Sequence, residues 1–336
     1  MIRRHGISAL PIFFLVTFAF FCAVVPRFAT AGNLEALMAG YAFIAIVAMG
    51  ESFAILLRGV DLSVGAVMAL AGMVAFDASL ILHLPGYLSV ALALVVATFA
   101  GVLNGLLIVF LRLQPFIATL ATLAAYRGIV FAISGRQLVP GLSTTALDDP
   151  WIIGLETYFD VGATLGVESI AVPAIPLSFL LMIVLLVLFE VLLRSTRFGR
   201  DFYATGGNPE AARLAGIDLR RTVLIGYALS GFCAGVAALL LVARLTTSTE
   251  ALGNGMELTA IAAAVIGGVR LNGGMGSMWG PVVGTFLLGV VLMGLTLFGI
   301  SQFVQQILTG AVLLAAIAHS RWLQSRRLLP SAPEGS

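Results

Sequence analysis

The sequence predicts an all-α, polytopic membrane protein with about ten transmembrane helices and with both termini in the cytoplasm. Two observations support this fold class. Of the 336 residues, 60% are hydrophobic and only 10% are charged, whereas a soluble domain has about 25% charged residues. Apolar stretches close to the roughly 20 residues that cross the hydrocarbon core as a helix also recur along the whole chain. We therefore expect residues 1–336 to form a single transmembrane domain.

The predicted spans follow one another along the chain. They cover residues 7–25, 36–57, 62–82, 87–111, 116–133, 177–193, 222–244, 256–269, 280–299 and 302–318. The eighth span is short and flanked by glycine, which leaves its full crossing open. The first span follows two arginines, as the apolar part of a signal peptide does, but Pro26-Arg27-Phe28 lacks the small residues of a cleavage site. We expect it to remain as an anchor.

Arginine positions predict the orientation of the spans. All 18 positively charged residues are arginine, and short cytoplasmic loops of membrane proteins are enriched in positive charge. About ten crossings that begin in the cytoplasm place most of these arginines on the cytoplasmic side. The same parity places the acidic connection 134–176 outside, as an external cap, and the arginine-rich connection 194–221 inside.

The cytoplasmic connection contains the signals of a short helix. Asn208 is a preferred N-cap residue, Pro209 suits the first helical turn, and Gly216 suits a left-handed exit. These signals predict a helix of about seven residues, roughly 10 Å long. An alternative is that 194–221 is only a solvated loop held against the lipid headgroups.

Several ionisable or polar residues fall within the predicted spans, where they usually face protein or water. Glu51, Asn104 and Thr119 lie in the cytoplasmic third of three spans, so they either converge on a polar pathway or form ordinary hydrogen bonds between helices. Asp77 and Arg127 lie in the outer half of two spans and are expected to form an ion pair that locks the bundle.

Two glycine-bearing segments interrupt the spans. Asp61 and Ser63 follow Gly59 at a break between spans, where irregular backbone either lines a cavity or precedes a helix that Asp61 caps. Gly267 and Gly268 begin a glycine-rich region that suits close helix contact and a flexible gate.

The residues that are missing exclude several functions. A chain without lysine has no P-loop and no lysine nucleophile. His5, His83 and His319 are too far apart in sequence for a local zinc-binding pair, and Cys22 and Cys233 lie in apolar runs. A net charge of +2 does not indicate a nucleic-acid partner. We expect a protein that is not an enzyme and that needs no cofactor or metal.

Four stretches of the sequence resemble one family of membrane proteins. Residues 196–217 resemble the coupling segment of permeases in ATP-binding-cassette (ABC) sugar importers of the ribose, xylose, autoinducer-2 and galactofuranose type, within a superfamily that includes branched-chain amino-acid permeases. Residues 59–65, 115–128 and 263–277 are similar to the same family. Arg58 and Arg270 depart from it, because relatives commonly have glycine and a small polar residue at these positions.

The resemblance implies a permease subunit that imports a monosaccharide or a similar small polyol across a bacterial inner membrane by alternating access. It implies a pair of separate ATP-binding subunits, a periplasmic solute-binding protein, a second permease subunit (identical or paralogous) and the lipid bilayer as partners. The expected ATPase-coupling residues are Gly199, Ala204, Gly206, Gly207, Asn208, Glu210, Ala211, Ala212, Gly216 and Ile217. The expected pathway or gate residues are Glu51, Gly59, Asp61, Ser63, Asn104, Thr119, Gly267 and Gly268.

Other functions remain open on the sequence alone. A related permease could carry branched-chain amino acids or another small polar solute. A secondary transporter or channel would need no ATPase, and a membrane-embedded enzyme has no visible catalytic constellation.

Overall fold

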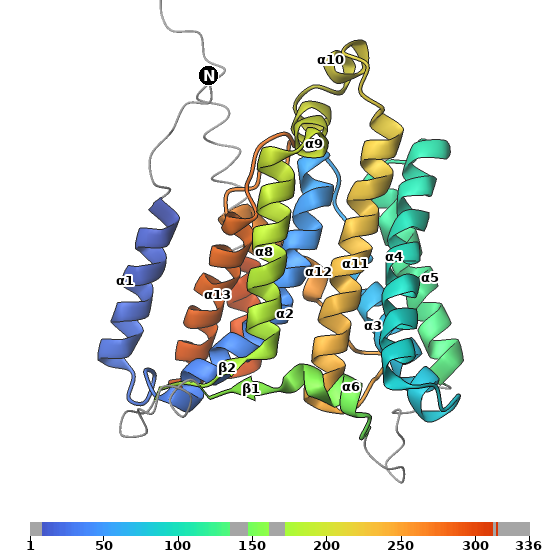
Figure 1. Ribbon diagram of the computed structural model, residues 1–336. Coiled ribbons are helices and arrows are strands. Elements are labelled where there is room, and N and C mark those ends of the chain that lie inside the picture. The colour runs from blue at the N-terminus through green and yellow to red at the C-terminus, as the bar shows by residue number, and fades with distance from the viewer. Residues whose placement is uncertain (1–8, 135–146, 161–171, 312–313, 315–336) are drawn as a thin grey trace, which may run out of the picture.

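A computed structural model describes residues 9–134, 147–160, 172–311 and 314. Within this part the chain is a bundle of helices that run mostly side by side (Figure 1). The main helices are α1 (Ala9–Val24), α2 (Ala31–Leu56), α3 (Val64–Leu80), α4 (Gly86–Phe110), α5 (Pro115–Ser134), α8 (Leu177–Ser195), α11 (Leu219–Leu245), α12 (Met256–Ile266) and α13 (Trp279–Leu297). Residues 302–311 are also helical.

Six of these helices, α2, α4, α5, α8, α11 and α13, are long and apolar enough to cross a membrane. Shorter apolar helices occupy the predicted first, third and eighth spans. The all-α, multi-pass architecture is therefore confirmed. The count of about ten crossings stays a prediction, and so does the location of the termini, because residues 1–8 and 315–336 lie outside the described part.

The eighth predicted span differs most from its expected form. Helix α12 has 11 residues, which is about 16 Å at 1.5 Å per residue and about half of a hydrocarbon core of roughly 30 Å. The described helix is thus shorter than a full crossing, and the crossing of this segment stays a prediction. Residues 246–255, which connect α11 to α12, are not helical.

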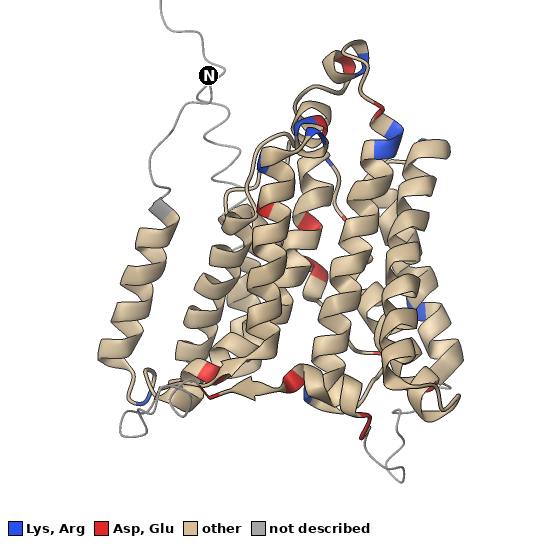
Figure 2. Cartoon of the chain, viewed as in Figure 1, with Lys and Arg blue, Asp and Glu red and all other residues tan. Residues whose placement is uncertain are grey.

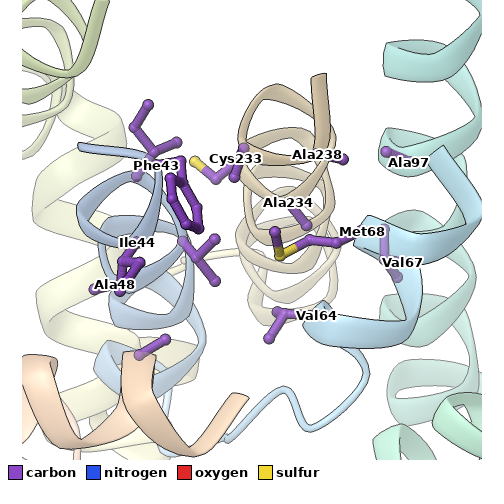
Figure 3. Packing of buried hydrophobic residues seen from close by; sticks show 14 of the residues in the cluster. Phe43, Ile44, Ala48, Val64, Val67, Met68, Ala97, Cys233, Ala234 and Ala238 are labelled. Carbon is purple, nitrogen blue, oxygen red and sulfur yellow. The ribbon is translucent and has the colours of Figure 1, made fainter. Parts of the chain in front are cut away.

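The core is built around α2 and α11. Helix α2 packs against α8, α11, α12 and α13, and α11 packs against α3 and α4. Figure 3 shows the packing around Cys233, Ala234 and Ala238 of α11, which face side chains from α2, α3 and α4. Glycine permits the close approach, since a Cβ at Gly50 would overlap Cys233. Small residues let helices approach closely where lipid gives no hydrophobic drive for association.

The described part of the connection between α5 and α8 lies across one end of the bundle, opposite α9 (Arg197–Gly207) and α10 (Pro209–Leu214) (Figure 1). It contains α6 (Pro150–Ile153), the 3-10 turn η1 (Gly154–Glu156), and strands β1 (Tyr158–Phe159) and β2 (Ile175–Pro176), which pair antiparallel. Charged residues gather near both ends of the bundle (Figure 2).

Two side chains fix this connection. Asp149 caps α6 by accepting a 2.9 Å hydrogen bond from the Trp151 amide, and Glu35 of α2 accepts a 2.8 Å bond from the Ala174 amide. Residues 135–146 and 161–171 of the expected cap lie outside the described part, and its position outside the membrane stays a prediction.

Candidate functional site

The predicted short helix is confirmed. Helix α10 (Pro209–Leu214) begins after Asn208, whose side-chain oxygen accepts hydrogen bonds of 3.1 Å from the amides of Glu210 and Ala211. Pro209 occupies its first turn, and Gly216 has a φ of +82° just beyond its end. The helix projects from the end of the bundle (Figure 1), and Leu214 is 79% exposed.

A second helix, which the sequence reasoning missed, leads into α10. Helix α9 (Arg197–Gly207) is capped by the Thr196 hydroxyl, which accepts a 3.3 Å hydrogen bond from the Gly199 amide. The signal was visible in the sequence: threonine precedes phenylalanines at 198 and 202, one helical turn apart. Helices α9 and α10 together form an elbow, and we call residues 196–217 the coupling segment.

The expected coupling residues divide into two groups. Gly207, Asn208, Glu210, Ala211 and Gly216 are exposed, whereas Gly199, Gly206 and Ala212 are buried against the chain itself, with Ala204 and Ile217 half-buried. Ala212 is only 3% exposed. A large side chain at Ala212 would therefore disturb the packing of this chain itself.

The end of α9 is fastened to the end of α2. The Arg58 guanidinium donates from Nε to the Gly206 carbonyl oxygen at 2.6 Å and also donates to the Gly207 carbonyl oxygen. These carbonyls lie in the last turn of α9, where they have no partner within the helix. Gly206 itself lies against the Leu56 carbonyl oxygen, so closely that a Cβ would overlap it.

The loop between α12 and α13 also contacts the ends of α2 and α9. The Gly274 amide donates to the Leu56 carbonyl oxygen at 2.9 Å, and the Tyr203 hydroxyl donates to the Gly276 carbonyl oxygen at 2.8 Å. Burial raises the pKa of the Tyr203 hydroxyl, as does the nearby carboxylate of Glu190, so it remains a donor at neutral pH. We call this meeting of α2, α9 and the loop 267–278 the junction.

A buried polar cluster lies just beyond the end of α2. Glu51 on α2 accepts a 3.0 Å hydrogen bond from the Asp61 amide. The Asn104 amide on α4 donates to the Ser63 hydroxyl at 2.7 Å and to Asp61 Oδ1 at 3.4 Å. Thr119 donates to the Val60 carbonyl oxygen at 3.1 Å. The structure thus brings together the polar residues that the sequence placed at a similar depth.

Asp61 is the hub of this cluster and is 1% exposed. Its Oδ1 accepts from the amide and the hydroxyl of Ser63, at 3.0 and 2.7 Å, and its Oδ2 accepts from the Ser230 hydroxyl of α11 at 2.9 Å. The expected N-cap is wrong, because α3 begins only at Val64 and Ser63 occupies the cap position. Asp61 instead closes a local turn and ties it to α4 and α11.

Glu51 Oε2 and the Tyr227 hydroxyl are buried next to this cluster, and neither has a hydrogen-bond partner among the described residues. Gly59 packs against that hydroxyl, and a Cβ there would overlap it. Gly267 and Gly268 lie apart from the cluster: Gly267 packs against the backbone of Gly280 where α12 meets α13, and Gly268 has a φ of +88°. These contacts favour close helix approach at that crossing.

The expected ion pair between Asp77 and Arg127 is wrong. Among the described residues the salt bridges join Arg194 to Glu190 and Arg213 to Glu210. The Arg127 guanidinium instead donates to the carbonyl oxygens of Leu252, at 3.0 Å, and Glu250. Backbone carbonyls in the segment before α12 therefore satisfy its charge, because that segment is not helical and leaves them available.

The structure also contains a cavity that the sequence reasoning missed. It has a volume of about 650 Å³ and lies between α2, α12, α13 and the helical residues 302–311. None of the expected pathway residues lines it. The sequence signal was a helical spacing of polar side chains at Gln302, Gln305, Gln306 and Thr309.

Comparison with known proteins shows which family the chain is similar to. A family model described as "Branched-chain amino acid transport system / permease component" matches residues 33–317. The ribose import permease protein of Haemophilus influenzae is 32% identical over 316 residues, which is 94% of this chain and 93% of the relative.

Two further relatives are similar over nearly the whole chain. The D-allose transport system permease protein of Escherichia coli is 34% identical, with 90% of this chain and 88% of the relative covered. The L-arabinose ABC transporter permease protein of Azospirillum brasilense is 32% identical, with 97% and 90% covered.

No solved structure matches the chain significantly. The family model covers most of the chain, and the relatives exceed 30% identity over nearly all of it. The resemblance that the sequence motifs indicated is therefore confirmed. The relatives described above are sugar permeases. The chain is a multi-pass membrane protein and belongs to the family of permease components that is described after branched-chain amino acid transport systems.

Proposed function

We propose that this chain is the transmembrane permease subunit of an ATP-driven importer of a monosaccharide or a similar small polyol. The names of its relatives refer to ribose, D-allose and L-arabinose, which supports a sugar as the solute. The chain works in a bacterial inner membrane with a second permease subunit, a pair of ATP-binding subunits and a periplasmic solute-binding protein. The α9 end of the bundle faces the cytoplasm.

The observation that carries this proposal is the coupling segment. Helix α10 projects from the bundle and exposes Glu210, Ala211 and Leu214, while α9 is fixed to α2 by Arg58. A short helix that is exposed at its tip and rigid at its base suits docking into a cleft of a separate motor subunit. A chain without a P-loop needs such a motor for ATP-driven transport.

Alternating access is the mechanism that this geometry supports. Closure of the ATP-binding subunits displaces α10, and the junction passes the displacement to the end of α2 and to the loop 267–278. The buried polar cluster, which holds Glu51, Gly59, Asp61, Ser63, Asn104 and Thr119, then acts as the gate. The crossing at Gly267 and Gly268 acts as a second moving element. Packed interfaces of this kind switch between discrete arrangements rather than deforming continuously.

The test uses an exposed position on α10. Ala211→Arg adds a bulky charge without disturbing the buried side of the helix, so we expect the chain to fold but to lose co-purification with the ATP-binding subunits and to lose transport. Ala29→Arg, which makes the same exchange at an exposed position near the opposite end of the bundle, is the matched control. Normal association and transport by Ala211→Arg contradict the proposal.

A second solute is favoured by one observation, the description of the family model as a branched-chain amino-acid component. Proteoliposomes that contain the complete importer decide between the two solutes, with labelled ribose, D-allose, L-arabinose and leucine offered separately. ATP-dependent uptake of a sugar supports the proposal. Uptake of leucine alone favours the alternative, and uptake without the ATP-binding subunits indicates a secondary transporter or a channel.

A further inference from the structure

The cavity between α2, α12, α13 and residues 302–311 has no role in the mechanism above. Its volume of about 650 Å³ lies within the range of about 300–1,000 Å³ that is usual for small-ligand pockets. Tyr41 of α2 and Thr285 of α13 form two of its walls. The other two walls supply most of its polar side chains.

One of these walls is a helix with a polar face. Gln302, Gln305, Gln306 and Thr309 are spaced so that they share one side of the helix, and all four line the cavity. Phe303 and Ile307, on the other side, are 79% and 71% exposed, and Gln302 and Gln306 are exposed too, so the cavity is open at this wall. Within a bundle of this composition, polar side chains are expected to face protein or water. The polar face of this helix is therefore directed toward the cavity.

Part of that polar face has no hydrogen-bond partner among the described residues. The Gln305 amide donates to the Thr296 hydroxyl at 3.0 Å and to the Ile300 carbonyl oxygen at 2.9 Å. Within the described residues, the side chains of Gln302 and Gln306 have no such hydrogen bond. Each therefore offers an amide donor and an acceptor to whatever occupies the cavity.

The other polar wall is the start of α12. Gly253 and Gly255 have φ values of +70° and +78°, and α12 begins at Met256 without a side-chain cap. Asn254, Glu257 and Thr259 line the cavity from this wall. Irregular backbone at membrane depth is tolerated only where it is buried in protein or lines a water-filled cavity. Arg127 holds this backbone in place through the Leu252 carbonyl oxygen.

The lining chemistry selects among ligands. Besides apolar side chains such as Ile44, Leu288 and Leu292, it combines primary amides and hydroxyl groups with one carboxylate and one aromatic ring, and among the described residues it includes no arginine. An anion would meet no cation there, and an amino acid would lack a partner for its carboxylate. A neutral polyol can pair each of its hydroxyl groups with an amide or a hydroxyl, and one face of a sugar ring can lie against Tyr41.

We infer that this cavity is a sugar-binding station on the translocation pathway, and that the solute passes here rather than through the fully buried cluster around Asp61. The inference rests on the proposed function. In this arrangement, amides on 302–311 and polar groups at the start of α12 bind the sugar. The polar cluster around Asp61, next to the junction, is a separate gate that controls opening.

The experiment measures ATP-dependent uptake of labelled ribose, D-allose, L-arabinose and xylose by the complete importer in proteoliposomes. In a Gln302→Ala, Gln306→Ala double variant we expect uptake of the transported sugar below KM to fall about tenfold or more, since each lost hydrogen bond is worth about fivefold. Gln114→Ala, an exposed glutamine in the turn between α4 and α5, is the matched control and keeps normal uptake. Uptake by the double variant that equals the control overturns the inference.

Two further variants test the inference independently of how well the double variant folds. Thr309→Trp fills the cavity, and we expect no uptake but normal co-purification with the ATP-binding subunits. Gln306→Cys, combined with Cys22→Ser because Cys233 is buried, reports occupancy: the transported sugar is expected to slow maleimide labelling, whereas those of the four sugars that the importer does not take up are expected to leave the rate unchanged. Uptake by Thr309→Trp, or labelling that the sugar leaves unchanged, contradicts the inference. If the unaltered importer takes up none of the four sugars, the proposed function itself fails.

Discussion

Arg58 Nε donates a 2.6 Å hydrogen bond to the Gly206 carbonyl oxygen, across 148 positions of the sequence. This bond joins the end of the membrane helix α2 to the base of the coupling segment. Arg58 has a φ of +66°, a conformation that favours glycine, so the side-chain contact is maintained despite backbone strain. The family resemblance led us to expect glycine at this position.

Removal of the Arg58 side chain is expected to uncouple ATP hydrolysis from transport. Arg58→Ala removes two charge-assisted hydrogen bonds, which weakens the junction by about 1–3 kcal/mol because the site is partly exposed. The chain should still associate with the ATP-binding subunits, since α10 is untouched. We expect normal ATP hydrolysis with transport reduced about tenfold or more, measured together in proteoliposomes.

Arg200→Ala is the control for this prediction, because Arg200 is an exposed arginine on the same helix α9. It should keep the ratio of solute moved to ATP hydrolysed. An unchanged ratio in Arg58→Ala would show that the junction transmits no motion through this side chain.

Gly206 and Gly207 are neighbours on α9 with opposite expected tolerance. A Cβ at Gly206 overlaps the Leu56 carbonyl oxygen and the Gly274 amide, which are backbone atoms that cannot rotate away, whereas a Cβ at Gly207 meets nothing within 4 Å. Gly206→Ala should lower the free energy of unfolding by about 1–3 kcal/mol and reduce transport. Gly207→Ala should be close to neutral. Thermal inactivation of the two purified variants measures the difference, and equal midpoints would contradict the close contact.

Asp61 should be among the most sensitive polar positions for stability. Asp61→Ala leaves the hydroxyl groups of Ser63 and Ser230 without their acceptor in a buried site, at a cost of about 3 kcal/mol. Asp61→Asn keeps the shape and one acceptor oxygen, so its loss should be smaller. Ser89→Ala provides the comparison, since the Ser89 hydroxyl is buried without a hydrogen-bond partner in the described part of the chain and its removal should not destabilise the protein. Thermal unfolding in detergent ranks the three variants, and a neutral Asp61→Ala would be inconsistent with the observed hydrogen bonds.

Arg127 and Asp77 are expected to behave as independent sites. Arg127→Met removes the donor that holds the carbonyl oxygens of Glu250 and Leu252, so the start of α12 should loosen and uptake should fall by about tenfold. Asp77→Asn should leave uptake unchanged, because the two side chains form no ion pair. Uptake by the single variants and by the double variant measures their coupling. A double variant that recovers the loss caused by Arg127→Met would restore the ion-pair interpretation.

Local signals in the sequence carried over well to the structure. Each predicted span contains a helix, because an apolar run of sufficient length must satisfy its own backbone in lipid. Asn208, Pro209 and Gly216 marked the limits of α10, since a helix cap depends on residues within one turn. The weak point was α12, where composition could not distinguish a half-length helix from a full crossing.

The sequence by itself determined that this is a membrane-spanning helical member of the permease family with a short capped helix after Asn208, because apolar length, capping residues and family motifs are read over short distances. Only the tertiary structure decided that Arg127 binds backbone carbonyls rather than Asp77, that Arg58 holds Gly206, and that the amides of Gln302 and Gln306 face a cavity. Those partners are distant in sequence. Their positions follow from close helix packing, such as that between Gly50 and Cys233, whose fit depends on three-dimensional shape rather than on residue type.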